Sequence, residues 1–172
     1  MKQQRCCSGK SVLTSLRAIA YLAEGIGTTK GVDANLDALS TEGNLRWHTD
    51  LARKVSTQTG AAIVISGPID IVADSHEAWA IRNGHPMMAN ITGTGCMSAG
   101  VIGCCVGADP QALLPSCVCA MSAMGICGEL AYEKLLSVDG GSGTYRVLLM
   151  DAMSKLDGAT LTRRSKAERL RI

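Results

Sequence analysis

The stretch Ala61-Ala62-Ile63-Val64-Ile65-Ser66-Gly67 decides the fold class of this chain. It is a short, continuous apolar run closed by Ser-Gly, which is typical of a strand buried on both faces. Residues 41–58 before it repeat leucine and valine at helical spacing, and Gly60 follows as a stop signal. A helix that leads into a fully buried strand predicts an α/β layer architecture built on parallel strands.

A short β-hairpin is expected directly after this strand. Residues 69–73 and 77–81 have the composition of strands, and Asp-Ser-His at 74–76 is a turn signal between them. A loop with the sequence Asn-Gly-His-Pro at 83–86 then leads onward. His85 in this loop is a candidate base, but a structural role is the better interpretation of a loop histidine before proline.

Residues 90–96, Asn-Ile-Thr-Gly-Thr-Gly-Cys, are the strongest candidate for a functional site. They run into an apolar, small-residue segment long enough for a helix. A glycine loop that opens a helix presents free backbone N–H groups and the positive end of the helix dipole, which together bind anions. We expect Gly93, Thr94 and Gly95 to form a phosphate or oxyanion hole. Cys96 would lie on the first turn, where the same field favours its thiolate.

The same stretch also fits a plainer interpretation. Thr92 or Thr94 would be an ordinary N-cap, the two glycines would form a turn, and Cys96 would be one of many buried small residues. Short glycine motifs are weak evidence by themselves. Local physics therefore leaves both interpretations open.

Four more segments are expected to be helical, namely 12–24, 97–108, 112–128 and 145–156. The two central ones are apolar, but at about 12 and about 17 residues they are shorter than the roughly 20 that span a bilayer. Both are therefore expected to be buried helices of a soluble domain, and no membrane partner is predicted.

Length and charge restrict the size of the fold and the partners that this chain is expected to bind. A length of 172 residues suits one compact domain, and a formal net charge of +2 gives no reason to expect nucleic acid as a partner. The C-terminal tail, residues 157–172, is basic and is expected to be a solvated, frayed end. No apolar leader follows the first methionine, so a cytoplasmic location is expected.

The eight cysteines are expected to be buried free thiols of a reducing compartment. They lie mostly inside apolar runs, and no C-x-x-C pair occurs. With only three histidines to assist, they do not predict a protein-ligated metal site.

Four motifs together resemble hydroxyethylthiazole kinase. They are Ser66-Gly67-Pro68-Ile69-Asp70, Asn83-Gly84-His85-Pro86-Met87-Met88, Thr92-Gly93-Thr94-Gly95-Cys96 and Gly141-Ser142-Gly143-Thr144-Tyr145. Lys30-Gly31-Val32-Asp33 also resembles the glycine-valine-aspartate segment of that family. The resemblance divides the chain into a non-matching segment 1–15, a partial kinase domain 16–156 and the basic tail 157–172.

The resemblance implies a ribokinase-like α/β fold and a homotrimer with active sites at subunit interfaces. It implies transfer of the γ-phosphoryl group of ATP, with Mg²⁺, to the primary alcohol of 4-methyl-5-(2-hydroxyethyl)thiazole in thiamine salvage. Carried over position by position, Ser66 is an ATP contact and Gly93 a substrate contact. Cys96 takes the place at which ribokinase relatives have a catalytic Asp.

The chain departs from the family pattern on its N-terminal side. The family's Arg-Gly-Asn-x-x-Glu-Ile should align near residues 10–16, where Lys10 can replace the ATP-contacting charge but Ser15 offers no carboxylate to magnesium. We therefore expect an N-terminally truncated kinase whose residues 1–15 come from a truncated or frame-shifted gene. Two alternatives stay open: a non-catalytic nucleotide-binding or assembly module, and a ribokinase-like kinase of another small alcohol.

Overall fold

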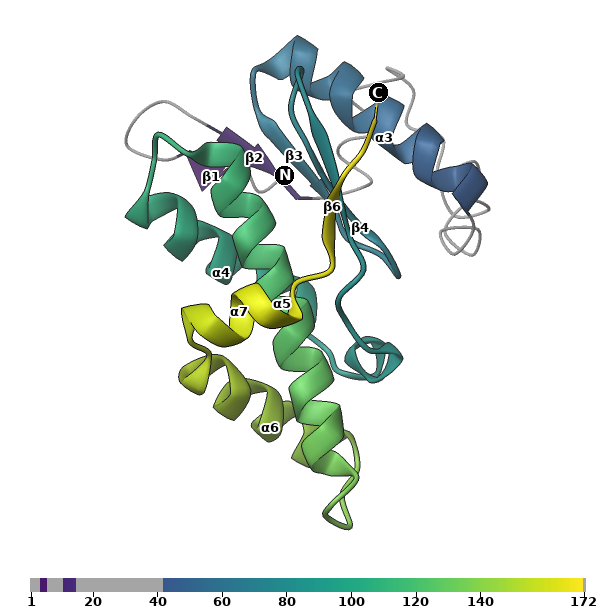
Figure 1. Ribbon diagram of the computed structural model, residues 1–172, viewed down its shortest axis with the longest axis vertical. Coiled ribbons are helices and arrows are strands. Elements are labelled where there is room, and N and C mark those ends of the chain that lie inside the picture. Colours follow the sequence, from purple (N-terminus) through teal and green to yellow (C-terminus); the bar gives the residue numbers. More distant parts are fainter. Residues whose placement is uncertain (1–3, 6–10, 15–41, 172) are drawn as a thin grey trace.

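The computed structural model describes residues 4–5, 11–14 and 42–171. Within these ranges one mixed sheet of six strands, in the order β1-β2-β3-β4-β5-β6, is packed with helices (Figure 1). The strands are β1 (Gln4–Arg5), β2 (Ser11–Leu13), β3 (Ala62–Ile65), β4 (Asp70–Ala73), β5 (Ala78–Ile81) and β6 (Ala167–Arg169). The helices are α3 (Glu42–Thr59), the 3₁₀ helix η1 (Pro86–Asn90), α4 (Thr94–Ala108), α5 (Leu113–Leu135), α6 (Ser142–Lys155) and α7 (Gly158–Arg164).

Strand β3 is buried along its whole length, as its apolar run predicts. Ile63 and Ile65 pack in the cluster that includes Val55 of α3, whereas Ala62 and Val64 pack in the cluster built by α4 and α5. Because successive side chains of a strand point to opposite faces, both faces of β3 need apolar residues. The α/β class is confirmed, with helices on both sides of the sheet.

The expected hairpin is confirmed, because β4 and β5 pair antiparallel, but fewer strands pair in parallel than expected. In the described part of the chain, β2 and β3 are the one parallel pair, and the other four neighbouring pairs are antiparallel. One reason is two short turns: residues 66–69 return the chain from β3 to β4, and the β4–β5 hairpin then reverses it again. Its turn is held by the Asp74 carboxylate, which accepts hydrogen bonds from the N–H groups of His76 (2.7 Å) and Glu77 (2.8 Å).

The predicted helices are confirmed in four cases and wrong in one. Helix α3 ends before Gly60, which has a positive φ of 66°. Helices α4 and α6 begin a few residues earlier than expected, and α5 continues to Leu135. The helix expected over 12–24 is wrong at its start, because residues 11–13 form β2 and pair with β3; its other residues from 15 onward lie outside the described ranges.

Helix α5 runs through two of the three cores of the protein. Its first half packs against the sheet with α4, and its second half packs against α6 (Figure 1). Within the described ranges α5 is the one helix long and apolar enough to cross a membrane, yet 67% of its most apolar stretch is buried inside the protein. Packing on the sheet and on α6 therefore accounts for its apolar surface.

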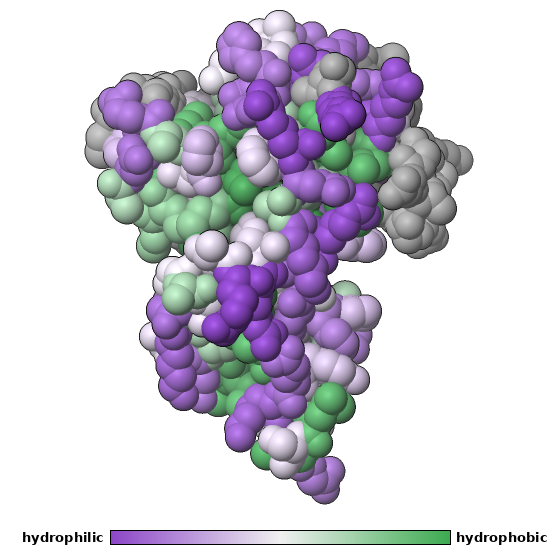
Figure 2. Space-filling model, in the orientation of Figure 1, coloured by the Kyte–Doolittle hydropathy of each residue, from purple (hydrophilic) through white to green (hydrophobic). Residues whose placement is uncertain are grey.

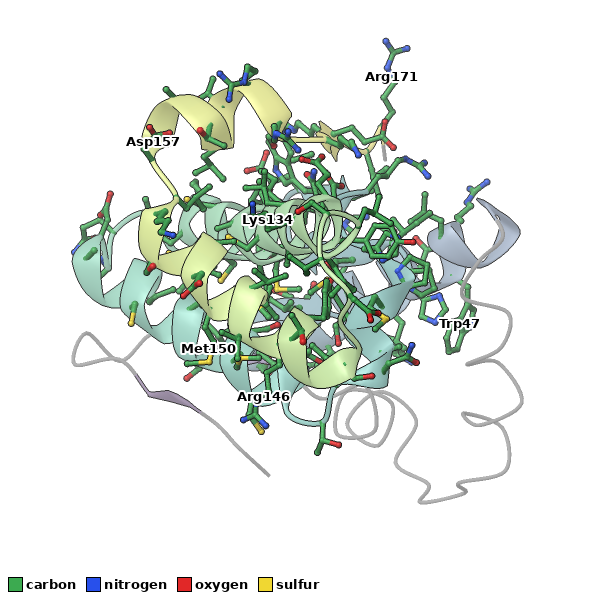
Figure 3. All side chains as sticks on the ribbon, turned by 90° about the horizontal axis from the view of Figure 1, so that it is seen from below. Trp47, Lys134, Arg146, Met150, Asp157 and Arg171 are labelled. Atoms are coloured by element: carbon green, nitrogen blue, oxygen red, sulfur yellow. The ribbon has the colours of Figure 1, made fainter. Side chains whose placement is uncertain are left out.

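Tyr145 fixes α6 against α5. Its side chain is fully buried, and its hydroxyl donates a hydrogen bond of 2.9 Å to the carbonyl oxygen of Gly128. Burial raises the pKa of the Tyr145 hydroxyl to about 12. The opposite side of α6 is uncovered: Val147 and Met150 are each 58% exposed, and Figure 3 shows Met150 and Arg146 pointing away from the body of the protein.

The C-terminal tail is not frayed, and that expectation is wrong. After α7, β6 pairs antiparallel with β5. Three tail cations form ion pairs with acidic residues of α5 and of the β4–β5 hairpin: Arg164 with Glu133 (2.7 Å), Lys166 with Glu129 (2.9 Å) and Arg169 with Glu77 (2.9 Å). The tail is therefore part of the sheet, and the division of the chain at residue 157 stays a prediction.

Asn83 is the buried link between the tail and α5. Its side-chain amide donates to the Arg164 carbonyl (3.0 Å) and the Glu129 carboxylate (3.2 Å), and its oxygen accepts from the N–H of Lys166 (2.7 Å). Asn83→Ala is expected to lower the free energy of unfolding by about 2–4 kcal/mol, because buried partners lose their hydrogen bonds. Urea denaturation followed by circular dichroism measures this change.

Glu168→Ala is the control for Asn83→Ala. It removes only the ion pair between Glu168 and Arg82, which is exposed on the surface. A loss of less than about 1 kcal/mol is expected, since exposed pairs contribute little. Equal losses in the two variants would contradict the role given to Asn83.

Candidate functional site: the loop that opens helix α4

Helix α4 begins with a set of free backbone donors. Gly93 is its N-cap residue, with φ 98° and ψ 3°, and no side chain caps the helix. The first intrahelical bond runs from the N–H of Met97 to the Gly93 carbonyl (3.0 Å). Among the described residues, none accepts a hydrogen bond from the N–H groups of 93–96. The alternative in which Thr92 or Thr94 caps the helix is therefore wrong.

The two glycines of this loop are open to solvent. A Cβ atom added at Gly93 or Gly95 would meet nothing within 4 Å, and both glycines are exposed. The left-handed φ of Gly93 is a conformation that residues with a Cβ adopt only at a cost, so the loop requires glycine there. The positive end of the α4 dipole and the unpaired amides together can hold an anion.

Cys96 lies on the first turn of α4 and is exposed as a free thiol. The interpretation of Cys96 as a buried core residue is wrong, because Ile102 and Val106 are the residues that α4 buries. The exposed residues of α4 are all small, and Figure 2 shows apolar surface on the side of the molecule where α4 lies in Figure 1. Cys96 and the amides of 93–95 therefore share one open junction of loop and helix.

The loop before α4 is anchored by His85 and Ile91. The Nδ1 atom of His85 accepts a hydrogen bond from the N–H of Met87 (3.1 Å), and its ring stacks on Tyr132 of α5 with centroids 3.5 Å apart. Ile91 is buried in the core that α5 and α6 share. His85 thus has the structural role expected of it, and these contacts fix where α4 begins.

The other predicted site residues lie on separate segments. Ser66 is exposed at the carboxyl end of β3, and among the described residues no hydrogen bond joins it to the loop 90–96. Lys10 lies outside the described ranges. The roles of Ser66 and Lys10 toward ATP stay predictions.

Asp70 ends the motif that begins at Ser66, but the sequence did not identify it as a site residue. It begins β4, and its Oδ1 accepts a hydrogen bond of 2.9 Å from the N–H of Gly67, next to Ser66. Burial raises the pKa of the Asp70 carboxyl to about 7, although the Gly67 hydrogen bond acts in the opposite direction. The sequence did contain one signal for this residue, because Asp70 is the acidic first residue of a strand whose other residues are apolar. Its carboxyl can take up and release a proton near neutral pH.

Only some of the described cysteines are buried, so the expectation that they are buried thiols is wrong in part. Cys117 and Cys127 are buried, and burial raises their pKa values to about 12 and about 11. Cys96, Cys104 and Cys119 are exposed. Among the described residues, no group of three or more His, Cys, Asp or Glu side chains is placed to hold a metal ion.

These features define a layered α/β protein with an anion-accepting helix N-terminus, and comparisons with known proteins give the family. The model of the Hydroxyethylthiazole kinase family matches residues 15–159. The chain belongs to the hydroxyethylthiazole kinase family.

Individual relatives agree with this assignment. The chain is 48% identical over 161 residues to a hydroxyethylthiazole kinase of Desulfovibrio desulfuricans, an alignment that covers 90% of this chain and 56% of the relative. It is 41% identical over 147 residues to one of Clostridium acetobutylicum, covering 86% and 54%. The solved structure of hydroxyethylthiazole kinase protein from Pyrococcus horikoshii OT3 has the same fold, with a TM-score of 0.69, 20% identity, and coverage of 95% and 66%. The chain spans about half the length of the curated relatives it matches.

Proposed function

We propose that this chain carries the phosphate-binding part of a kinase that transfers the γ-phosphoryl group of ATP to the primary alcohol of 4-methyl-5-(2-hydroxyethyl)thiazole, a step of thiamine salvage. The observation that carries the proposal is the set of N–H groups of residues 93–96 at the start of α4, for which the described part of the chain offers no hydrogen-bond acceptor. Membership of the hydroxyethylthiazole kinase family supports the choice of substrate.

The proposed chemistry asks mainly for positioning and charge stabilisation. A phosphoryl group in transfer carries its charge on three equatorial oxygens, so preorganised N–H donors stabilise it without any covalent step by the protein. The amides of Gly93, Thr94 and Gly95 are proposed to hold these oxygens, with Gly93 also against the thiazole alcohol. Because the donors are fixed by the helix, they need no reorganisation when charge develops.

Cys96 is proposed to lie beside the attacking hydroxyl group. Its thiol is exposed and belongs to the same turn as the amides, so both can face one ligand. It would orient the alcohol and accept its proton as the new O–P bond forms. The loose transition state makes positioning the larger part of this role.

Two further residues are proposed to contact ATP. Ser66, exposed after β3, is proposed to contact the nucleotide, and Lys10 to supply a positive charge. Mg²⁺ would arrive with the phosphates of ATP, since this ion is commonly held by one or two carboxylates plus substrate phosphates. Asp70 is a half-buried carboxyl close in sequence to Ser66, and it is the residue we would test first for an effect on the metal.

We also propose that the chain forms a homotrimer in the cytoplasm. The uncovered apolar residues Val147 and Met150 on α6, each 58% exposed, support an interface on this side. The mass of the assembly in solution, measured by light scattering, tests the trimer.

A second candidate function is nucleotide binding without turnover. It needs only the amides at the start of α4, which can hold a phosphate group without any transfer step. A kinase of a different small alcohol is less well supported, since the relatives from Desulfovibrio desulfuricans and Clostridium acetobutylicum are both hydroxyethylthiazole kinases.

The decisive experiment measures ADP release from Mg-ATP with 4-methyl-5-(2-hydroxyethyl)thiazole. We expect turnover that falls by roughly 10²-fold in Cys96→Ala, the lower end of what a positioned acid–base group contributes. Cys104→Ala is the matched control, because Cys104 is another exposed cysteine of α4, two turns further on, and should leave the rate unchanged.

Other outcomes separate the candidates. ATP binding by calorimetry without ADP release would identify the non-catalytic module. Turnover of Cys96→Ala equal to that of the native chain would remove Cys96 from the reaction. Absence of both ATP binding and ADP release would refute the phosphate site itself.

A further inference from the structure

Four cysteines gather where the second half of α4 packs beside the first half of α5 (Figure 1). They are Cys104 and Cys105 on α4, and Cys117 and Cys119 on α5. Cys105 packs against the apolar core that contains Cys117. None of the four belongs to the loop 90–96 that carries the proposed phosphate site, so their chemistry is a separate question.

The loop between α4 and α5 fixes the two helices against each other. The Asp109 carboxylate accepts hydrogen bonds from the N–H groups of Gln111 (3.2 Å) and Ala112 (3.3 Å). The N–H of Asp109 donates to the carbonyl of Cys105 (3.2 Å), and the Ser116 hydroxyl donates to the carbonyl of Asp109 (3.4 Å). A turn bonded in this way determines which residues of α4 and α5 face each other.

Cys105 and Cys119 are the two thiols of this group that interact most closely across the helices. Burial raises the pKa of the Cys105 thiol, and Cys119 raises it further through its charge and through a hydrogen bond between the two thiols. Cys105 is half-buried and Cys119 is exposed, so the pair can be reached from solvent. Cys117 is fully buried, and burial together with the charge of Cys105 raises its pKa to about 12, which leaves it inert.

The two thiols differ in a way that suits successive steps of thiol–disulfide exchange. Exchange begins with attack by a thiolate on a disulfide sulfur, and it requires access to that sulfur. The exposed Cys119 has this access. The half-buried Cys105, with its raised pKa, stays mostly protonated until a disulfide sulfur lies directly beside it. Its attack is then intramolecular, which makes it fast.

We propose that Cys105 and Cys119 form a reversible disulfide by exchange with a small-molecule disulfide. The Cys119 thiolate attacks one sulfur of that molecule, its S–S bond breaks, and the first half leaves as a thiolate that takes up a proton. Cys105 then gives up its proton and attacks the Cys119 sulfur, which releases the second half as a thiol. The two protein thiols lose two electrons, and the small disulfide gains them to become two thiols.

The bond would join α4 to α5 and close a loop of residues 105–119. Because the two thiols already interact, this bond needs little movement of the helices. A disulfide restricts the unfolded chain, so the oxidised protein should resist urea better than the reduced one. The proposal does not depend on kinase activity.

The test uses oxidised glutathione as the small disulfide and the full, folded chain. The remaining thiols are blocked with iodoacetamide, and cleavage before Asp109 then places Cys105 and Cys119 on different peptides. Mass spectrometry is expected to find these two peptides joined by a disulfide, and Cys105→Ser and Cys119→Ser should each abolish the joined pair. Cys104→Ser is the matched control, because it removes the exposed thiol next to Cys105 and should keep the pair.

The single variants also test the order of the two steps. In Cys105→Ser, Cys119 should accumulate as a mixed disulfide with glutathione, because the second thiol is missing. Cys119 is exposed, so Cys119→Ser leaves the packing intact and tests the pair independently of Cys105→Ser. In the native chain, dithiothreitol should reverse both the disulfide and the gain in the urea midpoint.

Four results would overturn the proposal. They are the absence of a joined pair in the native chain, a joined pair that survives Cys105→Ser or Cys119→Ser, a joined pair that is lost in Cys104→Ser, and a joined pair that forms only when the chain is oxidised in urea. The last result would mean that unfolding, rather than the packing of α4 on α5, brings the thiols together.

Discussion

Replacing Gly125 by alanine is expected to lower the free energy of unfolding by about 3 kcal/mol, because the added methyl group has no room. A Cβ atom at this position of α5 would lie 2.6 Å from the Cβ of Asn83 and 2.7 Å from its backbone carbon and oxygen. These atoms are held by the hydrogen bonds of Asn83 to α5 and the tail, so they cannot yield as a flexible side chain would. The change is measured from urea denaturation by circular dichroism.

Gly100→Ala is the matched control for Gly125→Ala. Gly100 also lies inside a helix, α4, but a Cβ atom there would meet nothing within 4 Å. Alanine is a better helix former than glycine, so this variant is expected to gain up to about 1 kcal/mol. If both variants lost the same stability, the contact between α5 and Asn83 would not be the cause of the loss in Gly125→Ala.

The second large effect is a pH dependence of stability that comes from Asp70. Burial raises its pKa from 3.8 to about 7 in the folded protein, so between these values the folded state holds a proton that the unfolded state has released. Stability contributed by this proton is fully present below about pH 4 and is lost as pH rises through about 7. The full contribution approaches about 4 kcal/mol, from about 1.4 kcal/mol for each pH unit.

Asp70→Asn is expected to remove this dependence and to be more stable than the native chain above pH 7. The amide stays neutral at every pH, and its oxygen can still accept the hydrogen bond from Gly67. The free energies of unfolding of both proteins are compared from about pH 4 to about pH 8. Asp50→Asn, at an exposed position of α3, is the control and should follow the native curve. A constant difference between Asp70→Asn and the native chain across this range would contradict the buried, proton-binding carboxyl.

The parts of the fold that the sequence predicted are those that local physics determines. The apolar run at 61–65 is a strand because both its faces are covered, and α3 stops before Gly60 because that residue adopts a positive φ. The start of α4 was recognisable from alternating glycine and threonine, and Cys96 lies on its first turn. Each of these depends on residues close together in the chain.

The parts that were missed depend on partners far away in sequence. Residues 11–13 look helical alone and become a strand because they pair with β3. The tail reads as a solvated basic end, but Lys166 meets Glu129 of α5 and Asn83 across many intervening residues. The raised pKa of Asp70 is likewise a property of the packing around it.

Helix α5 joins two of the apolar cores, so their unfolding is coupled. Met121 belongs to the core under the sheet, and Met124, one turn further on, belongs to the core shared with α6. The two lobes visible in Figure 2 therefore share an uninterrupted helical backbone, and neither can melt without fraying the helix that the other requires. Amide protons in the middle of α5 are accordingly expected to exchange with solvent only through global unfolding, at one common rate on both sides of Gly125.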